Sequence, residues 1–181
     1  MSNYITSNFS NLIFSCSVPS QWHMEHRVPD HCVVFVRQGK LLISDKGRTE
    51  EIPAGSCVFL KKDCSVRLVK ASFAGKNYEG LNIRLPQNIL EDYFQRHLKN
   101  NEFPQDFTGL SNCFMRLNRT LCLQGLLSSI ILFVEEGQDP GQEMTELKVE
   151  ELILDLLQTN IRFFPTLFDF YRDWNVDLKE F

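Results

Sequence analysis

The chain has 181 residues, of which 43% are hydrophobic and 23% are charged, and its formal net charge is −4. This length and composition are typical of a globular protein with a full hydrophobic core. The acidic balance argues against direct binding of nucleic acid by this chain, because affinity for phosphates comes from clustered Lys and Arg.

The sequence shows no export or membrane signal, and its cysteines have no metal-binding spacing. Residues 1–20 lack a basic start and a continuous apolar stretch, as a secretory signal requires. The longest apolar run, residues 121–134, is too short and too polar to span a bilayer. The six cysteines form no C-x-x-C pair and no zinc-finger pattern: Cys16, Cys32, Cys57, Cys64, Cys113 and Cys122. We therefore expect a cytoplasmic protein with free thiols.

The first half of the chain, to about Leu85, is predicted to form short β-strands. Apolar, β-branched runs alternate there with turn residues, and Gly39 can take the positive φ that a hairpin turn needs. The expected strands cover residues 12–18, 22–28, 32–36, 41–43, 48–52, 56–60, 65–70 and 76–84. Short strands at this regular spacing predict a sandwich or a small barrel.

After Pro86 the apolar residues recur with a period of about 3.6, which predicts helices. The first begins at Pro86, the second is expected over about 111–136, and the third over about 142–160. The short Gly/Pro turn between the second and third predicts an antiparallel hairpin. From residue 163 the sequence is rich in aromatic residues and is predicted to be a linker. Residues 173–181 are predicted to begin another amphipathic helix.

The segment from Gly47 to Val58 carries the most specific pattern, G-x5-P-x-G-x2-V, which includes Pro53 and Gly55. It resembles the second motif of the cupin β-barrel, and Val58 stands where a metal-binding cupin has histidine. The resemblance implies a cupin-like barrel and argues against a catalytic metal.

The order of the predicted parts resembles the sensor half of AraC/XylS-type transcription regulators. The residues that carry the likeness are Phe35-x-x-x-Gly39-x-Leu41, residues 52–60, residues 148–154 and the closing residues 174–181. The resemblance implies an α+β fold with a cupin-like (jelly-roll) barrel at 1–85, a helical dimerisation subdomain at 86–162 and a linker at 163–181. It also implies that the natural chain continues past Phe181 into a DNA-binding half. The branch of type III secretion activators, whose sensor half binds a protein antiactivator, is a nearer relative to consider.

Metal and covalent catalysis are not supported by the residue pattern. His23 and His26 are three residues apart, so they point to opposite faces of a strand and cannot chelate one ion. With Glu25 and His31 they are expected to form a polar rim at the barrel mouth. No local sequence gives a cysteine both a base and an orienting group, as a nucleophile requires. We expect no enzyme activity, no metal and no cofactor.

Two sets of site residues are predicted from alternation and helical periodicity. An effector, either a small molecule or a protein, is expected near Trp22, His31, Phe35 and Phe59. A homodimer is expected to form through the helical hairpin, at Leu123, Leu126, Leu127, Ile130 and Val134. Two alternatives stay open: a protein-interaction barrel with a filled interior, and a small metal-dependent cupin enzyme.

Overall fold

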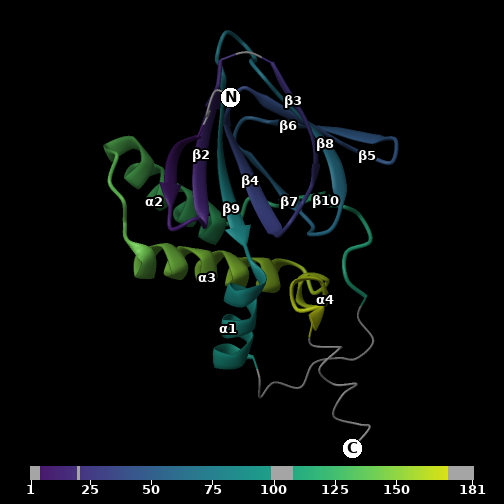
Figure 1. Ribbon diagram of the computed structural model, residues 1–181, viewed down its shortest axis with the longest axis vertical. Coiled ribbons are helices and arrows are strands. Elements are labelled where there is room, and N and C mark those ends of the chain that lie inside the picture. The colour runs from purple at the N-terminus through teal and green to yellow at the C-terminus, as the bar shows by residue number, and fades with distance from the viewer. Residues whose placement is uncertain (1–4, 20, 99–107, 171–181) are drawn as a thin grey trace, which may run out of the picture.

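The computed structural model describes residues 5–19, 21–98 and 108–170 (Figure 1). Antiparallel strands form two sheets in this part of the chain, and helices cover one end and one side of them. The strands are β1 (Ile5–Phe9), β2 (Ile13–Val18), β3 (Trp22–Arg27), β4 (His31–Gln38), β5 (Lys40–Asp45), β6 (Arg48–Pro53), β7 (Ser56–Leu60), β8 (Ser65–Ala71), β9 (Tyr78–Leu85) and β10 (Phe114–Arg116). The helices are α1 (Gln87–His97), α2 (Leu121–Glu136), α3 (Gln142–Thr159) and α4 (Phe163–Leu167).

The two sheets face each other and enclose a small barrel. One sheet has the strand order β1-β2-β9-β4-β7-β10 and the other has the order β3-β8-β5-β6. The tight connection between β4 and β5 depends on Gly39, whose φ is +71°. A Cβ at this position would lie 2.6 Å from the Ala71 carbonyl oxygen and 2.8 Å from the Tyr78 Cα. Any other residue there would therefore push two strands apart.

Side chains of the larger sheet alternate between the barrel interior and the helices. In β4, Val34 and Val36 point into the barrel, whereas Val33 belongs to the cluster that packs against the helices. This alternation follows from the period of two in an extended strand. The sheet is therefore a single wall with an apolar core on each side.

Helix α2 begins and ends where the sequence supplies caps. The Thr120 side chain accepts a hydrogen bond of 2.9 Å from the Leu123 N–H at the start of α2, and Gly137 ends the helix in the left-handed conformation. Helices α2 and α3 pack as an antiparallel pair beneath the larger sheet (Figure 1). The hairpin expected from the sequence is therefore present.

Strand β1 (Ile5–Phe9), strand β10 and helix α4 were not among the elements expected from the sequence. The second helix begins at Leu121 and not at about residue 111, because Phe114–Arg116 form strand β10 against β7. Phe114 is buried inside the barrel, which makes this segment part of the barrel wall and not of the helical part. Residues 163–167, expected to be a linker, form α4, with Phe163 and Leu167 fully buried. The predicted closing helix, residues 173–181, lies outside the described residues.

Candidate functional site

A cavity of about 380 Å³ lies inside the barrel. Its volume falls in the range of about 300–1,000 Å³ that is usual for small-molecule sites. Its lining comes from both sheets: Ile5, Phe14, Cys16, Val18, Trp22, Met24, Val28, Pro29, Asp30, Cys32, Val34, Leu41, Leu60, Leu68, Lys70, Asn82 and Arg84. Most of these side chains are apolar, so the cavity suits an apolar ligand with few polar contacts.

Lys70 is the cation inside this cavity that has no carboxylate partner among the described residues. Its Nζ lies 3.3 Å from the Cys16 Sγ, and 5.0 Å and 5.4 Å from the ring centroids of Trp22 and Tyr78. Thiol and aromatic contacts stabilise an ammonium less than a carboxylate does. The arrangement leaves a positive charge ready to pair with an anion.

The second cation of the cavity, Arg84, is already paired. It forms an ion pair with Asp30 and donates a hydrogen bond of 3.2 Å from Nη1 to the Asn11 carbonyl. Its guanidinium also lies 5.9 Å from the Phe14 ring centroid. Arg84 is thus neutralised by Asp30, whereas Lys70 has no carboxylate partner within the part of the chain that the structure describes.

A buried hydroxyl lies beside the cavity without a partner. Tyr78 is fully buried in the barrel interior, and its hydroxyl makes no hydrogen bond within the described part of the chain. The phenol lies over Gly80, where a Cβ would collide with it, and Gly80 pairs with Cys16. Burial, and then the nearby thiols of Cys16 and Cys32, raise the pKa of Tyr78. The hydroxyl thus stays protonated and faces two cysteines that line the cavity.

The structure does not bring the four predicted effector residues together. Trp22 lines the cavity. His31, Phe35 and Phe59 lie on the other face of the larger sheet, where Phe35 and Phe59 belong to the core beneath the helices. The reason is register: odd-numbered residues of β4 face the helices, and even-numbered ones face the barrel.

His31 is a core residue at the junction of barrel and α4, and not a rim residue as expected. It is fully buried, stacks on Phe59 at 5.4 Å, and accepts a hydrogen bond of 3.1 Å at Nδ1 from the Lys62 N–H. Burial, and then the Lys62 charge, lower the pKa of His31 to about 4, although Asp169 acts in the opposite direction. The ring is therefore neutral at physiological pH.

The predicted dimer residues pack inside the single chain. Leu123, Leu126, Leu127 and Ile130 are buried in the core between α2, α3 and the larger sheet, and Val134 packs against it. A partner chain cannot reach these four buried side chains. The periodicity correctly identified the apolar face of α2, but that face covers the barrel.

Other apolar side chains of the hairpin point to solvent instead. Leu132 on α2 is 60% exposed, and Leu147 and Leu154 on α3 are 57% and 47% exposed. Leu121, at the start of α2, is exposed as well. None of the helices in the described ranges is long and apolar enough to cross a membrane.

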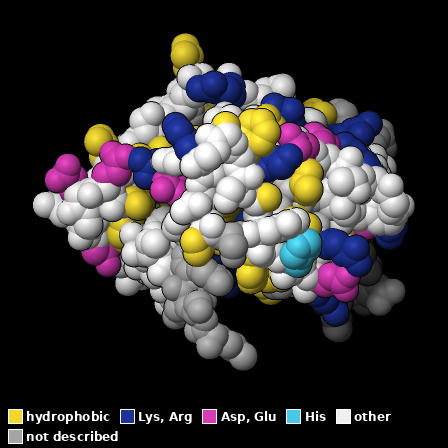
Figure 2. Space-filling model, turned by 90° about the horizontal axis from the view of Figure 1, so that it is seen from above, with side chains coloured by type: hydrophobic (Ala, Val, Ile, Leu, Met, Phe, Trp, Pro, Cys, Tyr) yellow, Lys and Arg dark blue, Asp and Glu magenta, His cyan; other side chains and the backbone are white. Residues whose placement is uncertain are grey.

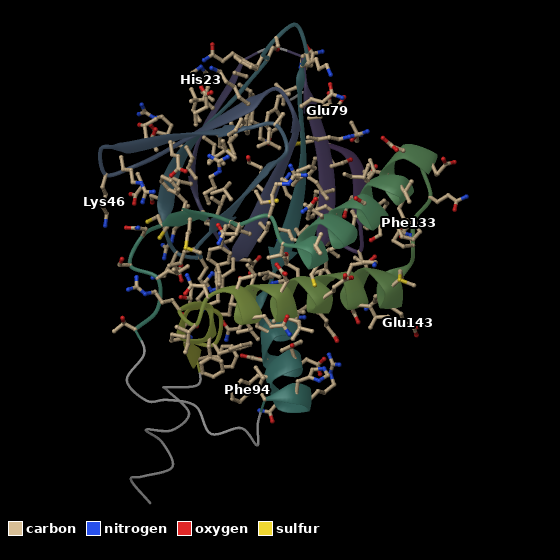
Figure 3. All side chains as sticks on the ribbon, turned by 180° about the vertical axis from the view of Figure 1, so that it is seen from behind. His23, Lys46, Glu79, Phe94, Phe133 and Glu143 are labelled. Atoms are coloured by element: carbon tan, nitrogen blue, oxygen red, sulfur yellow. The ribbon has the colours of Figure 1, made fainter. Side chains whose placement is uncertain are left out.

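The residues considered for a metal do not come together. His23 is exposed at the end of the barrel that points away from the helices (Figure 3). Val58 is fully buried in the barrel core. In the described ranges no three His, Cys, Asp or Glu side chains are placed to hold one ion. All six cysteines are free thiols.

The comparison with known families decides what kind of domain this is. The family model of the ExsA N-terminal regulatory domain matches residues 31–163, which is most of the chain. The chain belongs to this family. The resemblance to the sensor half of AraC-type regulators is thereby confirmed. A search of curated proteins finds no match.

Solved structures agree with the family in fold. Apo ToxT K231A from Vibrio cholerae is 14% identical, with a TM-score of 0.59 over 84% of this chain and 58% of that chain. Wild-type ToxT with a bound unsaturated fatty acid is 13% identical, with a TM-score of 0.55 over 80% of this chain and 52% of that chain. This chain thus spans little more than half the length of ToxT. The expected α+β fold with a cupin-like barrel is confirmed.

A ToxT structure with a small organic acid gives the same fold. ToxT bound to (E)-4-(8-methylnaphthalen-1-yl)but-3-enoic acid is 13% identical, with a TM-score of 0.51 over 80% of this chain and 56% of that chain.

Sequence reasoning missed Lys70, Asn82 and Tyr78 as site residues. One signal was present: Val66, Leu68 and Lys70 share the inward face of β8, so the lysine continues an apolar row into the barrel. A lysine at an inward strand position is expensive unless it has a partner. Gly80 has no Cβ, and the Tyr78 hydroxyl occupies the space that a Cβ would need. Nothing in the sequence indicates this contact.

Proposed function

We propose that this domain senses a small apolar molecule with an anionic head group, bound in the barrel cavity. The observation that carries the proposal is the ammonium of Lys70, which lies in an apolar cavity without a carboxylate partner among the described residues. Burying such a charge is costly, and an anionic ligand would offset that cost. The unsaturated fatty acid and the butenoic acid bound by ToxT are molecules of this type.

The larger sheet supplies the route from the cavity to the helices. Asn82 faces the cavity from β9, whereas its neighbours Leu81 and Ile83 pack in the core beneath the helices. At the end of β4, Arg37 forms ion pairs with Glu79 on β9 and Glu135 on α2. A ligand that shifts β9 would therefore also shift the surface against which the α2–α3 hairpin packs. For regulation, the ligand must bind the two arrangements with different affinity.

The hairpin is proposed to pair two copies of the chain through its outer face. Leu132 on α2 and Leu147 and Leu154 on α3 are apolar side chains of the hairpin that remain exposed to solvent. Pairing them across a twofold axis would remove apolar area from water. A dimer arranged in this way would bring two attached helix-turn-helix domains to two DNA half-sites.

The domain itself is proposed to act without catalysis and without DNA contacts, in the cytoplasm, where a regulator meets its DNA. The end of the barrel that points away from the helices carries Lys and Arg intermingled with Asp and Glu, with no large basic patch (Figure 2). A face of mixed charge gives phosphates little to bind. The cavity also favours a small-molecule sensor over an interaction barrel with a filled interior.

Thermal unfolding with two matched amphiphiles tests the proposal. Decanoate and decan-1-ol are both straight chains of ten carbon atoms, but only decanoate carries a negative charge. Binding to the folded state alone raises the melting temperature, so decanoate should raise it and decan-1-ol should raise it less. Lys70→Met should reduce the decanoate effect, whereas Lys76→Met, at an exposed lysine, should not. Equal effects of the two amphiphiles on the wild type would contradict the role of Lys70.

A further inference from the structure

Cys16 has an unusual setting among the thiols of this chain. Its side chain lines the cavity from β2 and is nearly buried. The Lys70 Nζ lies 3.3 Å and the Asn82 Nδ2 lies 3.7 Å from its Sγ. Two N–H donors are thus directed at one sulfur. The thiolate is the nucleophilic form of cysteine, and N–H donors and nearby cations favour that form.

Cys32 lines the same cavity in a different setting. Its thiol donates a hydrogen bond of 3.7 Å to the Val33 carbonyl, which holds the proton on the sulfur. Burial raises the pKa of Cys32 to about 12. The two cysteines therefore share access to one cavity, but only Cys16 is surrounded by donors. Cys32 provides a control within the same site.

A second observation points to a ligand beside Cys16. The Tyr78 hydroxyl is fully buried, lies over Gly80 opposite Cys16, and makes no hydrogen bond to any described residue. Buried hydroxyls in native structures normally have a partner. A ligand with an acceptor oxygen next to Cys16 would give Tyr78 that partner. Cys16 and Lys70 thus line one apolar cavity, and the Tyr78 hydroxyl, which is not part of the lining, lies at Gly80, the strand partner of Cys16.

We propose that Cys16 captures α,β-unsaturated carbonyl compounds with an apolar tail as covalent adducts. The proposal rests on the cavity being a ligand site, as proposed above. The Cys16 thiolate attacks the β-carbon and a sulfur–carbon bond forms. The π electrons of the C=C bond move toward the carbonyl oxygen, to which Tyr78 donates a hydrogen bond. The resulting enolate then takes a proton at the α-carbon from water.

This reaction is balanced without any further reagent. The proton that leaves the thiol returns through water, so the net change is addition of S–H across a C=C bond. No group leaves and nothing is oxidised or reduced. The adduct would keep the cavity occupied after the free compound has disappeared. Covalent capture would therefore keep the domain in its ligand-bound state after a brief exposure to the electrophile.

Adduct mapping by mass spectrometry tests the capture. The chain is treated with non-3-en-2-one, digested and sequenced, and each cysteine peptide is followed over time. We expect the Cys16 peptide to gain one ketone molecule about tenfold faster than the peptide of the exposed Cys122. Lys70→Met should slow Cys16 labelling about tenfold, because the nearby cation is lost. The Cys32 peptide should be labelled more slowly than the Cys16 peptide, whereas Cys16→Ser should remove the fast adduct.

The decanoate experiment separates failure of the capture from failure of the cavity proposal. If decanoate stabilises the chain and Cys122 is labelled before Cys16, the capture is overturned and the cavity proposal stands. If decanoate has no effect and Cys16 is still labelled first, the capture is supported and the anionic ligand is rejected. If both tests fail, both proposals are wrong. Nonan-2-one, which lacks the C=C bond, must leave every cysteine peptide unchanged.

Discussion

The two faces of the larger sheet carry apolar cores of different kinds. The core beneath the helices is filled with aromatic rings: Phe59 stacks on His31 at 5.4 Å and meets Phe163 edge-on at 5.0 Å. The core inside the barrel is apolar as well, but it surrounds a cavity of about 380 Å³ that contains an ammonium group. Close packing is the rule in protein interiors, so the hollow side is the exception that needs an explanation.

The difference separates stability from ligand binding. The filled core holds the hairpin and α4 to the barrel, and its side chains can change little without loss of folding free energy. We propose that the hollow core has looser packing because it leaves room for a ligand. Strand β9 contributes side chains to both cores, and the proposed coupling between ligand and hairpin runs through this strand. Four predictions sharpen this comparison.

The largest effect is expected when a charge enters the filled core. Ile130→Glu places a carboxylate where the side chain is 1% exposed, and should lower the free energy of unfolding by about 4 kcal/mol or more. Leu132→Glu, on the outer face of the same helix, should leave chain stability nearly unchanged. Urea denaturation measures both.

The same pair of variants tests the dimer. If the outer face pairs two copies, Leu132→Glu should give folded monomers in analytical ultracentrifugation. A folded, dimeric Leu132→Glu variant would place the contact elsewhere, and a folded Ile130→Glu variant would contradict the packing of α2 against the barrel.

The next effect compares one substitution on the two sides of the sheet. Leu152→Ala removes a fully buried side chain from the filled core, and should cost about 2–5 kcal/mol. Leu68→Ala removes a side chain that already faces the cavity, so fewer contacts are lost and the cost should lie below that of Leu152→Ala. Chemical denaturation of the two variants measures the two losses of unfolding free energy. Equal losses would mean that the cavity wall is packed as tightly as the helical core.

A pH effect is expected from His31 in the filled core. Its pKa is about 4 in the folded chain and 6.5 in its ordinary state, so the unfolded chain binds the proton more readily. Its contribution to stability is fully present above pH 6.5 and declines as the pH falls toward 4, by about 3 kcal/mol at most. His31→Gln should flatten the unfolding free energy over this range. An unchanged pH profile in the variant would exclude His31 as the cause.

The smallest effect is expected on the outer surface of the smaller sheet. Arg67 pairs with Glu25 across β3 and β8, and both side chains are mostly exposed. Solvent screens such a pair, so Arg67→Ala should change the unfolding free energy by less than about 1 kcal/mol. Melting in low and high salt checks this. A larger loss, independent of salt, would show that the outer surface contributes to stability as the cores do.

The sequence predicted local structure well and the contents of the two cores poorly. The strands from β2 to β9 and the helical hairpin follow from period and turn residues, and the structure contains them. Strand β10 was missed because three residues carry too little pattern, and only pairing with β7 reveals them. Helix α4 was missed because its aromatic residues show no helical period in the sequence. Only their packing in the core reveals the helix.

The candidate site was less accessible to sequence reasoning for a related reason. Alternation shows that His31 and Phe35 share a face, but it cannot say which face encloses the barrel. The same ambiguity affected α2, where one apolar stripe fits equally well a barrel or a partner chain. The unpaired state of Lys70 is a property of tertiary contacts, and no spacing in the sequence reports it.

Isothermal titration of the wild type and of Lys70→Met with decanoate tests the central claim most directly. We expect one binding site per chain in the wild type and an affinity about tenfold lower in the variant, since a charge-assisted contact is lost. Lys76→Met should bind as the wild type does. Absence of heat with the wild type, or equal affinity in Lys70→Met, would contradict the claim that this cavity recognises an anionic apolar ligand through Lys70.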